Sequence, residues 1–335
     1  MCEKVKVLIA GFGFMGQTHC GSLLKDPEAE VCGIIDPFDP AERLSSIKGN
    51  QQTVTITADD VRNIPHYTTL EEAFAKAQAD AVVIALPTKF HTQAVMMALD
   101  AGMHVFVEKP FALSAEDCRM MTDSAAEKNL RLAVGYVVRS MAPYRYLHNT
   151  VKSGVMGKLK LLRLTRETGQ PSWGNWSDPE FVKASGGALF DMLSHDFDFA
   201  RYCLGEPEKI TAVKELCGNF NGNLLTAVLD FGDGQAVVSG GFVQPSSYPF
   251  FSGFSAFFEN GSLIGDCTGM LKAAGNDGRV ETVELPGNDP YYDELRAFIS
   301  SVKNGTDSIV CSGADAAKTI GVCCEVAKQI GEINK

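Results

Sequence analysis

The first third of the chain alternates short apolar runs with segments of helical spacing, and this alternation restricts the possible folds more than any other feature. The apolar runs are Val5–Ala10, Val31–Ile35, Ala81–Leu86, Val105–Val107 and Leu132–Gly135. Strands that alternate with helices form a parallel sheet covered on both faces, and such strands are apolar along their whole length. We therefore predict an α/β domain with a doubly wound parallel sheet (Rossmann) over residues 1–136.

The pattern changes after this domain. One long helix is expected over Ala188–Leu204, and the other segments are mainly strand-like runs separated by turn signals. These runs are Lys158–Thr165, Ile210–Cys217, Leu224–Phe231, Gln235–Phe242, Phe250–Glu259 and Ser262–Asp266. Asn-Gly or Asp-Gly pairs at 221, 233, 260 and 277 are typical of tight hairpins. We predict a second, α+β domain over 137–335 with a large open, mainly antiparallel sheet, whose C-terminal helices could pack back on the first domain.

Composition narrows the class of partner. The chain has 335 residues, an apolar fraction of 45% and a formal net charge of -11. This charge disfavours a nucleic-acid or anionic-membrane surface, so a small-molecule partner is expected. Its 10 cysteines include no C-x-x-C pair and fit no zinc pattern, so we expect neither disulfides nor a metal. Because strand-like sequence begins at Val5 and no apolar run is long enough to cross a membrane, we expect a cytoplasmic protein.

A glycine motif follows the first apolar run directly. It consists of Gly11, Phe12, Gly13, Phe14, Met15 and Gly16. A G-x-G-x-x-G motif between a strand and a helix presents backbone N–H groups to a pyrophosphate. The alternative is an incidental loop in a glycine-rich chain. The position of the motif favours dinucleotide binding.

The second apolar run ends at Asp36, twenty residues after Gly16. A carboxylate at this place accepts hydrogen bonds from the adenosine ribose and repels a 2′-phosphate. This favours NAD over NADP as the cofactor. Arg43 could instead serve a phosphate or stack on the adenine, and Asp36 could be an ordinary turn residue at the end of a strand.

The run HVFVEKPFAL delivers Glu108, Lys109 and Pro110 at the carboxyl end of a strand, where ligands bind in doubly wound sheets. Pro110 restricts Lys109 to an extended backbone. Lys109 is either a catalytic residue or a solvated charge, and we also expect it and Glu108 to border the cofactor. In the preceding strand–helix connection, Pro87 and His91 are candidate cofactor contacts, although His91 could equally cap the following helix.

The helix after Gly186-Gly187 places Asp191 and His195 at positions i and i+4. This spacing allows the carboxylate to orient the imidazole, which makes His195 a candidate proton acceptor. The alternative for His195 is a structural helix histidine. Asp198 and Tyr202 continue the same stripe, and we expect Asp196 to be a buried carboxylate with a hydrogen-bond partner.

Polar and aromatic residues before this helix could line a substrate site together with Asp191 and His195. The candidates are Tyr136, Arg166, Trp173, Trp176 and Asp178. The indoles could stack on the apolar face of a sugar, but core packing explains them equally well.

Four stretches together resemble the Gfo/Idh/MocA family of nicotinamide-dependent oxidoreductases, and the HDFD run resembles its inositol 2-dehydrogenase branch. The stretches are GFGFMGQTH, PTKFHTQAVMMALDAGMHVFVEKP, GGALFDMLSHDFD and YYDELRAF. At 136–141 the chain reads YVVRSM where members commonly read FNRRFD, and Arg139 matches. The resemblance implies a Rossmann domain, dimer or tetramer contacts through the open sheet, and Lys109, Asp191 and His195 around the nicotinamide.

The expected function is hydride transfer between NAD and a secondary alcohol of a cyclic polyol or sugar. Such a reaction needs one group that takes the hydroxyl proton and another that polarises the oxygen. His195 can take the proton while Lys109 polarises the oxygen, and the reverse assignment stays open. Alternatives on the same scaffold are a dehydrogenase of a nucleotide sugar, an aldose or a dihydrodiol, and a glycosidase that uses bound NAD transiently. A non-catalytic NAD-binding regulator is the alternative of a different class.

Overall fold

The computed structural model describes residues 3–44, 56–171, 176–214, 224–245, 247–306 and 308–331. The chain divides into two compact units. The first unit contains residues 1–137 and 289–317, and the second contains 138–288 and 318–335. The sequence predicts one boundary, after residue 136. In the structure, residues 289–317 return to the first unit.

The first unit is built on a six-stranded parallel sheet. Its strands are β1 (Val5–Ala10), β2 (Ala29–Ile35), β3 (His66–Tyr67), β4 (Ala81–Ile84), β5 (His104–Glu108) and β6 (Leu132–Gly135). They lie in the order β3-β2-β1-β4-β5-β6. The central strands are almost wholly buried, as their continuous apolar sequences predict. The strand order reverses between β1 and β4, which is where such sheets bind ligands.

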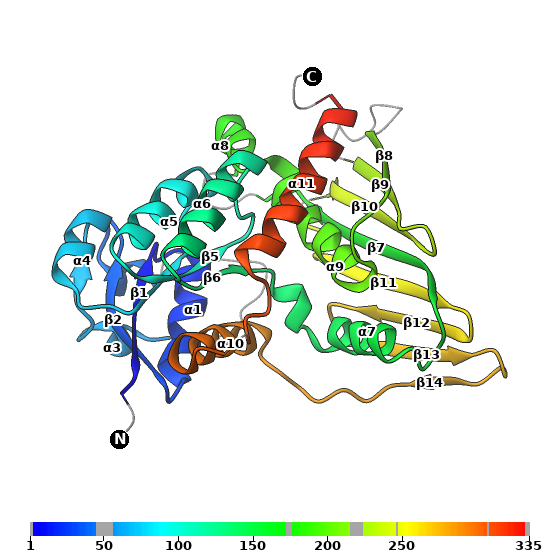
Figure 1. The fold of residues 1–335 in the computed structure, drawn as a ribbon, viewed down its shortest axis with the longest axis horizontal. Helices are drawn as coiled ribbons and strands as arrows, with labels where there is room; N and C mark the ends of the chain where they lie inside the picture. Colours follow the sequence, from blue (N-terminus) through cyan, green and yellow to red (C-terminus); the bar gives the residue numbers. More distant parts are fainter. Residues whose placement is uncertain are drawn as a thin grey trace. The chain divides into compact units, whose positions relative to one another are not determined.

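Helices cover both faces of this sheet. They are α1 (Phe14–Lys25), α2 (Pro40–Arg43), α3 (Ala58–Val61), α4 (Leu70–Lys76), η1 (Thr88–Phe90), α5 (His91–Asp100), α6 (Ala115–Glu127) and α10 (Pro290–Asn304). Figure 1 shows α1 and α10 on one face and α5 and α6 on the other. Asp289 caps α10 by accepting the Tyr292 N–H, and the helix ends at Gly305 with φ of 66°. The α/β prediction for this unit is confirmed.

The second unit contains an eight-stranded sheet in the order β14-β13-β12-β11-β7-β10-β9-β8. The strands are β7 (Leu159–Gly169), β8 (Lys209–Lys214), β9 (Leu224–Asp230), β10 (Gln235–Gln244), β11 (Phe251–Phe258), β12 (Gly261–Asp266), β13 (Leu271–Gly275) and β14 (Val280–Thr282). All neighbours are antiparallel except β7 and β10. The mainly antiparallel sheet is confirmed, and β13 and β14 are strands that the sequence did not predict.

The Asn-Gly and Asp-Gly pairs mark hairpins as expected. The pairs at 233, 260 and 277 lie between β9 and β10, β11 and β12, and β13 and β14. The pair at 221 lies outside the described residues, as do residues 215–217 of the run expected to end at Cys217.

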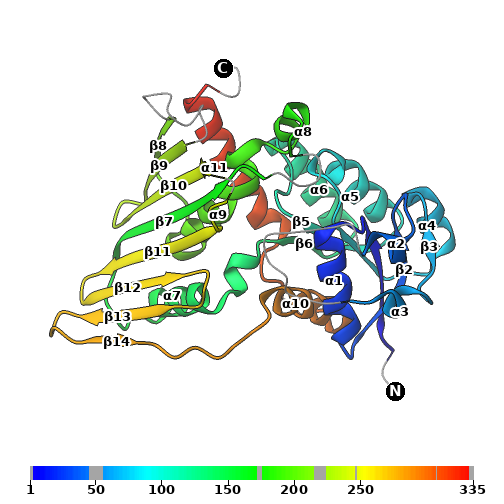
Figure 2. The same cartoon turned by 180° about the vertical axis from the view of Figure 1, so that it is seen from behind.

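The helical elements here are η2 (Val137–Ser140), α7 (Ala142–Ser153), α8 (Pro179–Ala184), η3 (Ala188–Leu193), α9 (Ser194–Leu204) and α11 (Gly313–Gln329), of which residues 313–317 belong to the first unit. Helices α7 and α9 lie on one face of the large sheet, and Figure 2 shows the other face without a covering helix in the described part of the chain. The single helix expected over Ala188–Leu204 is wrong in one respect. Its beginning, η3, is a π-helical turn, a feature that often occurs at functional sites.

Among the described residues, no helix combines the length and the apolar character needed to cross a membrane.

Candidate functional site

Close backbone contacts explain two glycines of the motif after β1, and the third lies beside open space. Gly11 has φ of +90°, and a Cβ atom there would lie 2.6 Å from the Ala85 carbonyl oxygen. A Cβ atom at Gly16 would collide with the Gly11 carbonyl oxygen, so this glycine allows α1 to pack on the turn. A Cβ atom at Gly13 would meet nothing within 4 Å. The open space lies at the start of α1, where no side chain caps the first turn, so these residues fit a pyrophosphate.

Asp36 lies beside this glycine turn, at the end of β2. Its carboxylate accepts the Phe12 N–H at 2.8 Å and the Phe38 N–H at 3.0 Å, and its side chain is only 3% exposed. The Arg43 guanidinium lies 3.3 Å from the same carboxylate and 4.8 Å above the Phe38 ring. Asp36 therefore holds the turn through the Phe12 N–H, and the same Oδ2 also accepts a hydrogen bond from Arg43. Its contact with the cofactor stays a prediction.

We expect Asp36→Ala to weaken NAD binding and to reduce the preference for NAD over NADP. The substitution removes the hydrogen bond that shapes the glycine turn, deletes the negative charge that repels a 2′-phosphate, and releases Arg43 from its ion pair. Calorimetric titration with both cofactors measures the change, and Asp39→Ala, which alters an exposed helix cap nearby, is the control. An unchanged ratio of the two dissociation constants would remove Asp36 from cofactor selection.

The ends of β4 and β5 carry the next group of candidate residues. Pro87 is exposed at the start of η1, and Lys109 is half-buried directly after β5. His91 is buried between them. Its Nε2 lies 2.8 Å from the Leu86 carbonyl oxygen and its Nδ1 lies 3.0 Å from the Pro110 carbonyl oxygen. Burial lowers the pKa of His91. In the structure His91 joins the two loops, and a direct cofactor contact by His91 or Pro87 stays a prediction.

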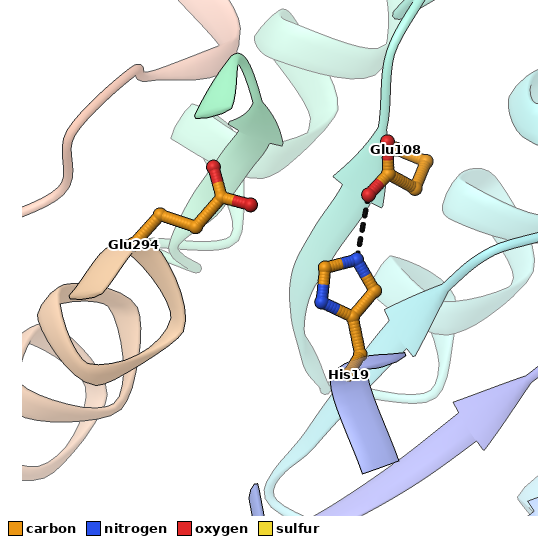
Figure 3. Close-up of side chains that lie close together, drawn as sticks. All are labelled: His19, Glu108 and Glu294. Carbon is orange, nitrogen blue, oxygen red and sulfur yellow. Dashed lines mark hydrogen bonds and ion pairs between the residues drawn. The ribbon is translucent and has the colours of Figure 1, made fainter. Parts of the chain in front are cut away.

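Glu108, the last residue of β5, points into the first unit. His19 Nε2 lies 2.6 Å from Glu108 Oε1, and Glu294 of α10 faces this pair (Figure 3). One ligand atom from each of the three buried residues lies within 4.8 Å of the other two. No sequence pattern predicts this cluster, because its members come from three distant segments and His19 looks isolated in QTH. The position of Glu108 makes it a support for its neighbour Lys109, while its contact with the cofactor stays a prediction.

Glu294 has no hydrogen-bond partner in the described part of the chain, although its side chain is almost completely buried. Burial raises the pKa of Glu294 well above its usual range, and the nearby charges of Glu108 and Asp289 raise it further. His19 is the remaining titratable member of the cluster. Because the pKa of Glu294 is raised in the folded state, the unfolded chain loses this carboxyl proton first as pH rises above 4.5. The free energy of unfolding therefore falls with rising pH until the folded protein loses the proton too.

We therefore expect Glu294→Gln to gain stability relative to the wild type as pH rises above 4.5, the pKa of the unfolded state. The difference should grow by up to about 1.4 kcal/mol per pH unit, since one proton is lost from the unfolded wild type only. Urea unfolding of both proteins at several pH values measures it. A difference that does not vary with pH would show that Glu294 is ionised in the folded protein.

The second unit holds the other two catalytic candidates. Asp191 lies half-buried in the π-helical turn η3, and His195 is 8% exposed in the first turn of α9. The turn begins at Gly187, whose φ of 59° and ψ of -156° suit glycine alone. Asp191 and His195 thus lie about one turn apart on a continuous helical segment. Lys109 belongs to the other unit, so the three proposed catalytic residues are divided between the units.

Two buried ion pairs hold α9. The Arg166 guanidinium on β7 contacts Asp196 with Nε at 2.7 Å and Nη2 at 3.2 Å, which confirms the expectation of a buried, bonded Asp196. Arg139 of η2 contacts Asp198 with both Nε and Nη2 at 2.7 Å, and Asp198 also accepts the Thr319 hydroxyl. Arg166 is thus engaged inside the unit, and its role in substrate binding stays a prediction.

The aromatic candidates are placed differently from one another. The Tyr202 ring lies between the Arg139 guanidinium, at 4.3 Å, and the stacked His148 ring, at 3.7 Å. Tyr136 is fully buried in the first unit. Trp176 packs edge-on against Phe181 and Phe242, which agrees with the core-packing alternative. Trp173 lies outside the described residues, and Asp178 caps α8 by accepting the Glu180 N–H.

Comparison with known proteins identifies both halves of the chain. Residues 5–136 match the model of the oxidoreductase family with an NAD-binding Rossmann fold, and residues 144–264 match the Gfo/Idh/MocA C-terminal domain. The myo-inositol 2-dehydrogenase of Thermotoga maritima is 27% identical over 93% of this chain and 92% of its own length.

Solved structures show the same fold over nearly the whole chain. The UDP-N-acetylglucosamine 3-dehydrogenase of Acidithiobacillus ferrooxidans superposes with a TM-score of 0.80 at 20% identity, covering 98% of both chains. An Agrobacterium radiobacter oxidoreductase, crystallised with NAD+, L-tartaric acid and magnesium, gives 0.81 at 19% identity over 98% of this chain and 96% of its own. With its glycine turn, its sheet order and both family domains in place, the chain belongs to the Gfo/Idh/MocA family of NAD-binding oxidoreductases.

Proposed function

We propose that the protein oxidises a secondary alcohol of a cyclic polyol or sugar, with NAD as hydride acceptor. The observation that carries this proposal is the glycine turn with open space at Gly13 together with Lys109 at the same carboxyl edge of the sheet. The names of two relatives support the substrate class, because inositol and N-acetylglucosamine both carry secondary hydroxyls on a six-membered ring.

The proposed reaction gives each residue a defined task. When bound, NAD supplies the group that accepts the hydride from the alcohol carbon. His195 accepts the hydroxyl proton as the C–O bond becomes a carbonyl, Asp191 orients the imidazole, and the Lys109 ammonium stabilises the charge that develops on oxygen. The reverse assignment, with Lys109 as base and His195 as donor, is the alternative. Return of the proton and hydride gives the reduction.

The test is NADH formation across a panel of inositols, aldoses, UDP-sugars, acyclic diols and aromatic diols, with Lys109→Met as the blank. Oxidation of one ring polyol by the wild type alone supports the proposal and identifies the substrate class. If only acyclic or aromatic diols are oxidised, the substrate class is wrong. If NAD binds by calorimetry and no alcohol is oxidised, a regulatory role replaces the enzymatic one.

We also propose that the chain forms a homodimer or homotetramer through the open face of the large sheet. Strand alternation places apolar side chains from several neighbouring strands on this face, several of them partly exposed. They are Leu161, Val213, Val228, Val237, Phe257 and Ile264. An apolar patch of this breadth is typical of a protein interface. Light scattering on the purified protein gives the assembly mass, and a monomer at micromolar concentration would contradict the proposal.

A further inference from the structure

The backbone on both sides of Lys109 is held by buried histidines. On the C-terminal side of Lys109, His91 bridges the carbonyl oxygens of Pro110 and Leu86. On the other side, Glu108 Oε2 accepts the Lys109 N–H at 3.1 Å, and Glu108 Oε1 lies 2.6 Å from His19 Nε2. The backbone at Lys109 is therefore held on both sides, by Glu108 before it and by the His91 contact with Pro110 after it.

The Glu108 carboxylate has little room to move. A Cβ atom at Gly135 would lie 3.2 Å from Glu108 Oε1 and 3.3 Å from Oε2, so the absence of a side chain on β6 leaves space for the carboxylate. On the opposite side, the His19 ring packs edge-on against Phe106 at 5.3 Å and Tyr291 at 6.2 Å between centroids. These contacts fix the ring and the carboxylate together, as Figure 3 shows for the pair itself.

A metal ion is the other arrangement that a buried histidine and two glutamates suggest. Two ligand atoms on one tetrahedral zinc ion with bonds of about 2.1 Å lie about 3.4 Å apart. His19 Nε2 and Glu108 Oε1 are 2.6 Å apart, which is the length of a short charge-assisted hydrogen bond. The closed pair thus fits a role in holding Glu108 better than shared coordination.

We propose that His19 is a positioning residue that acts through Glu108 on Lys109. His19 belongs to α1, the helix that begins at the glycine turn. Two hydrogen bonds, both to the Glu108 carboxylate, therefore connect this helix to the backbone of Lys109, which carries the ammonium. The catalytic role of Lys109 rests on the proposed function. The placement of Lys109 by His19 does not depend on that function and is measured separately.

The matched variants are His19→Gln, whose amide nitrogen can replace Nε2 as donor to Glu108, and His19→Leu, which cannot donate. We expect His19→Leu to lower kcat by about tenfold to a hundredfold, the size of a small displacement of a reacting group, while the dissociation constant for NAD+ stays close to wild type. His19→Gln should recover most of kcat. In a Lys109→Met background, His19→Leu should have no further effect on kcat, because it acts through Lys109.

A second readout needs no substrate. Reductive methylation with carbon-13 formaldehyde gives an NMR signal for Lys109, assigned by its loss in Lys109→Met. We expect His19→Leu to shift and narrow this signal and His19→Gln to leave it near its wild-type position. If His19→Leu does not fold, Gly135→Ala perturbs the Glu108 carboxylate from the other side and should move the same signal.

The outcomes separate the two proposals. A shifted signal in an enzyme that oxidises no polyol supports the positioning role and overturns the proposed function. Normal kcat and an unmoved signal in His19→Leu, with Lys109→Met inactive, overturn the positioning role and leave the proposed function standing. Equal losses of kcat from His19→Leu with and without Lys109 would also overturn it.

Discussion

Lys109→Met is expected to reduce turnover by about a hundredfold or more while NAD+ still binds with nearly unchanged affinity. The ammonium stabilises charge that exists only as the reaction proceeds, so its loss affects kcat more than ground-state binding. His195→Ala should show a loss of the same order, because it removes the proton acceptor. Steady-state kinetics with the substrate found in the panel, together with calorimetry, measures both quantities.

The matched control is Lys89→Met. Lys89 is an exposed lysine of η1 in the same unit, and its substitution by Met removes the same charge as Lys109→Met. Its kcat should equal that of the wild type. Near-normal turnover in Lys109→Met or His195→Ala would end the catalytic assignment of that residue, and a large loss in Lys89→Met would point to a general charge effect.

The second large effect is expected on stability. Asp196→Ala should lower the free energy of unfolding by about 3–5 kcal/mol, because it leaves the buried Arg166 guanidinium without its counter-charge. The double variant Arg166→Met with Asp196→Leu should recover much of this loss, since it removes both charges and retains apolar volume. Urea unfolding at neutral pH measures all three proteins.

Comparison with an exposed ion pair shows whether burial causes the expected loss of stability in Asp196→Ala. Lys158 and Asp233 lie 2.6 Å apart on the surface, and Asp233→Ala should change stability far less than Asp196→Ala. Similar losses from Asp196→Ala and Asp233→Ala would contradict the argument from desolvation. So would a double variant at 166 and 196 that is no more stable than Asp196→Ala.

Local patterns in the sequence predicted most of the fold. Continuous apolar runs identify the parallel strands, and the Asp-Gly pair at 277 marks a hairpin even though the strands around it were not predicted. Residues 280–282 are all exposed, so β14 has no alternation of buried and exposed side chains to reveal it. The π-helical turn was also hidden, because the spacing of apolar residues over 188–204 is compatible with a regular α-helix.

The site was predictable to the extent that it depends on motifs. The glycine turn and the EKP sequence lie where their strand contexts placed them. The bond between His19 and Glu108 joins residues 89 positions apart, and no local pattern encodes such a pair. The same is true of the hydrogen bond from the Phe12 N–H to Asp36, which depends on how β2 lies beside β1.

The two ion pairs of α9 restrict the motion of that helix as well as its stability. Asp196 and Asp198 are two residues apart, so their side chains leave the helix in nearly opposite directions, toward β7 and toward η2. A roll of the helix about its axis would move both carboxylates away from their guanidinium partners. His195, the neighbour of Asp196, therefore has a fixed direction in the second unit, and the freedom left to it is rotation about its own side-chain bonds.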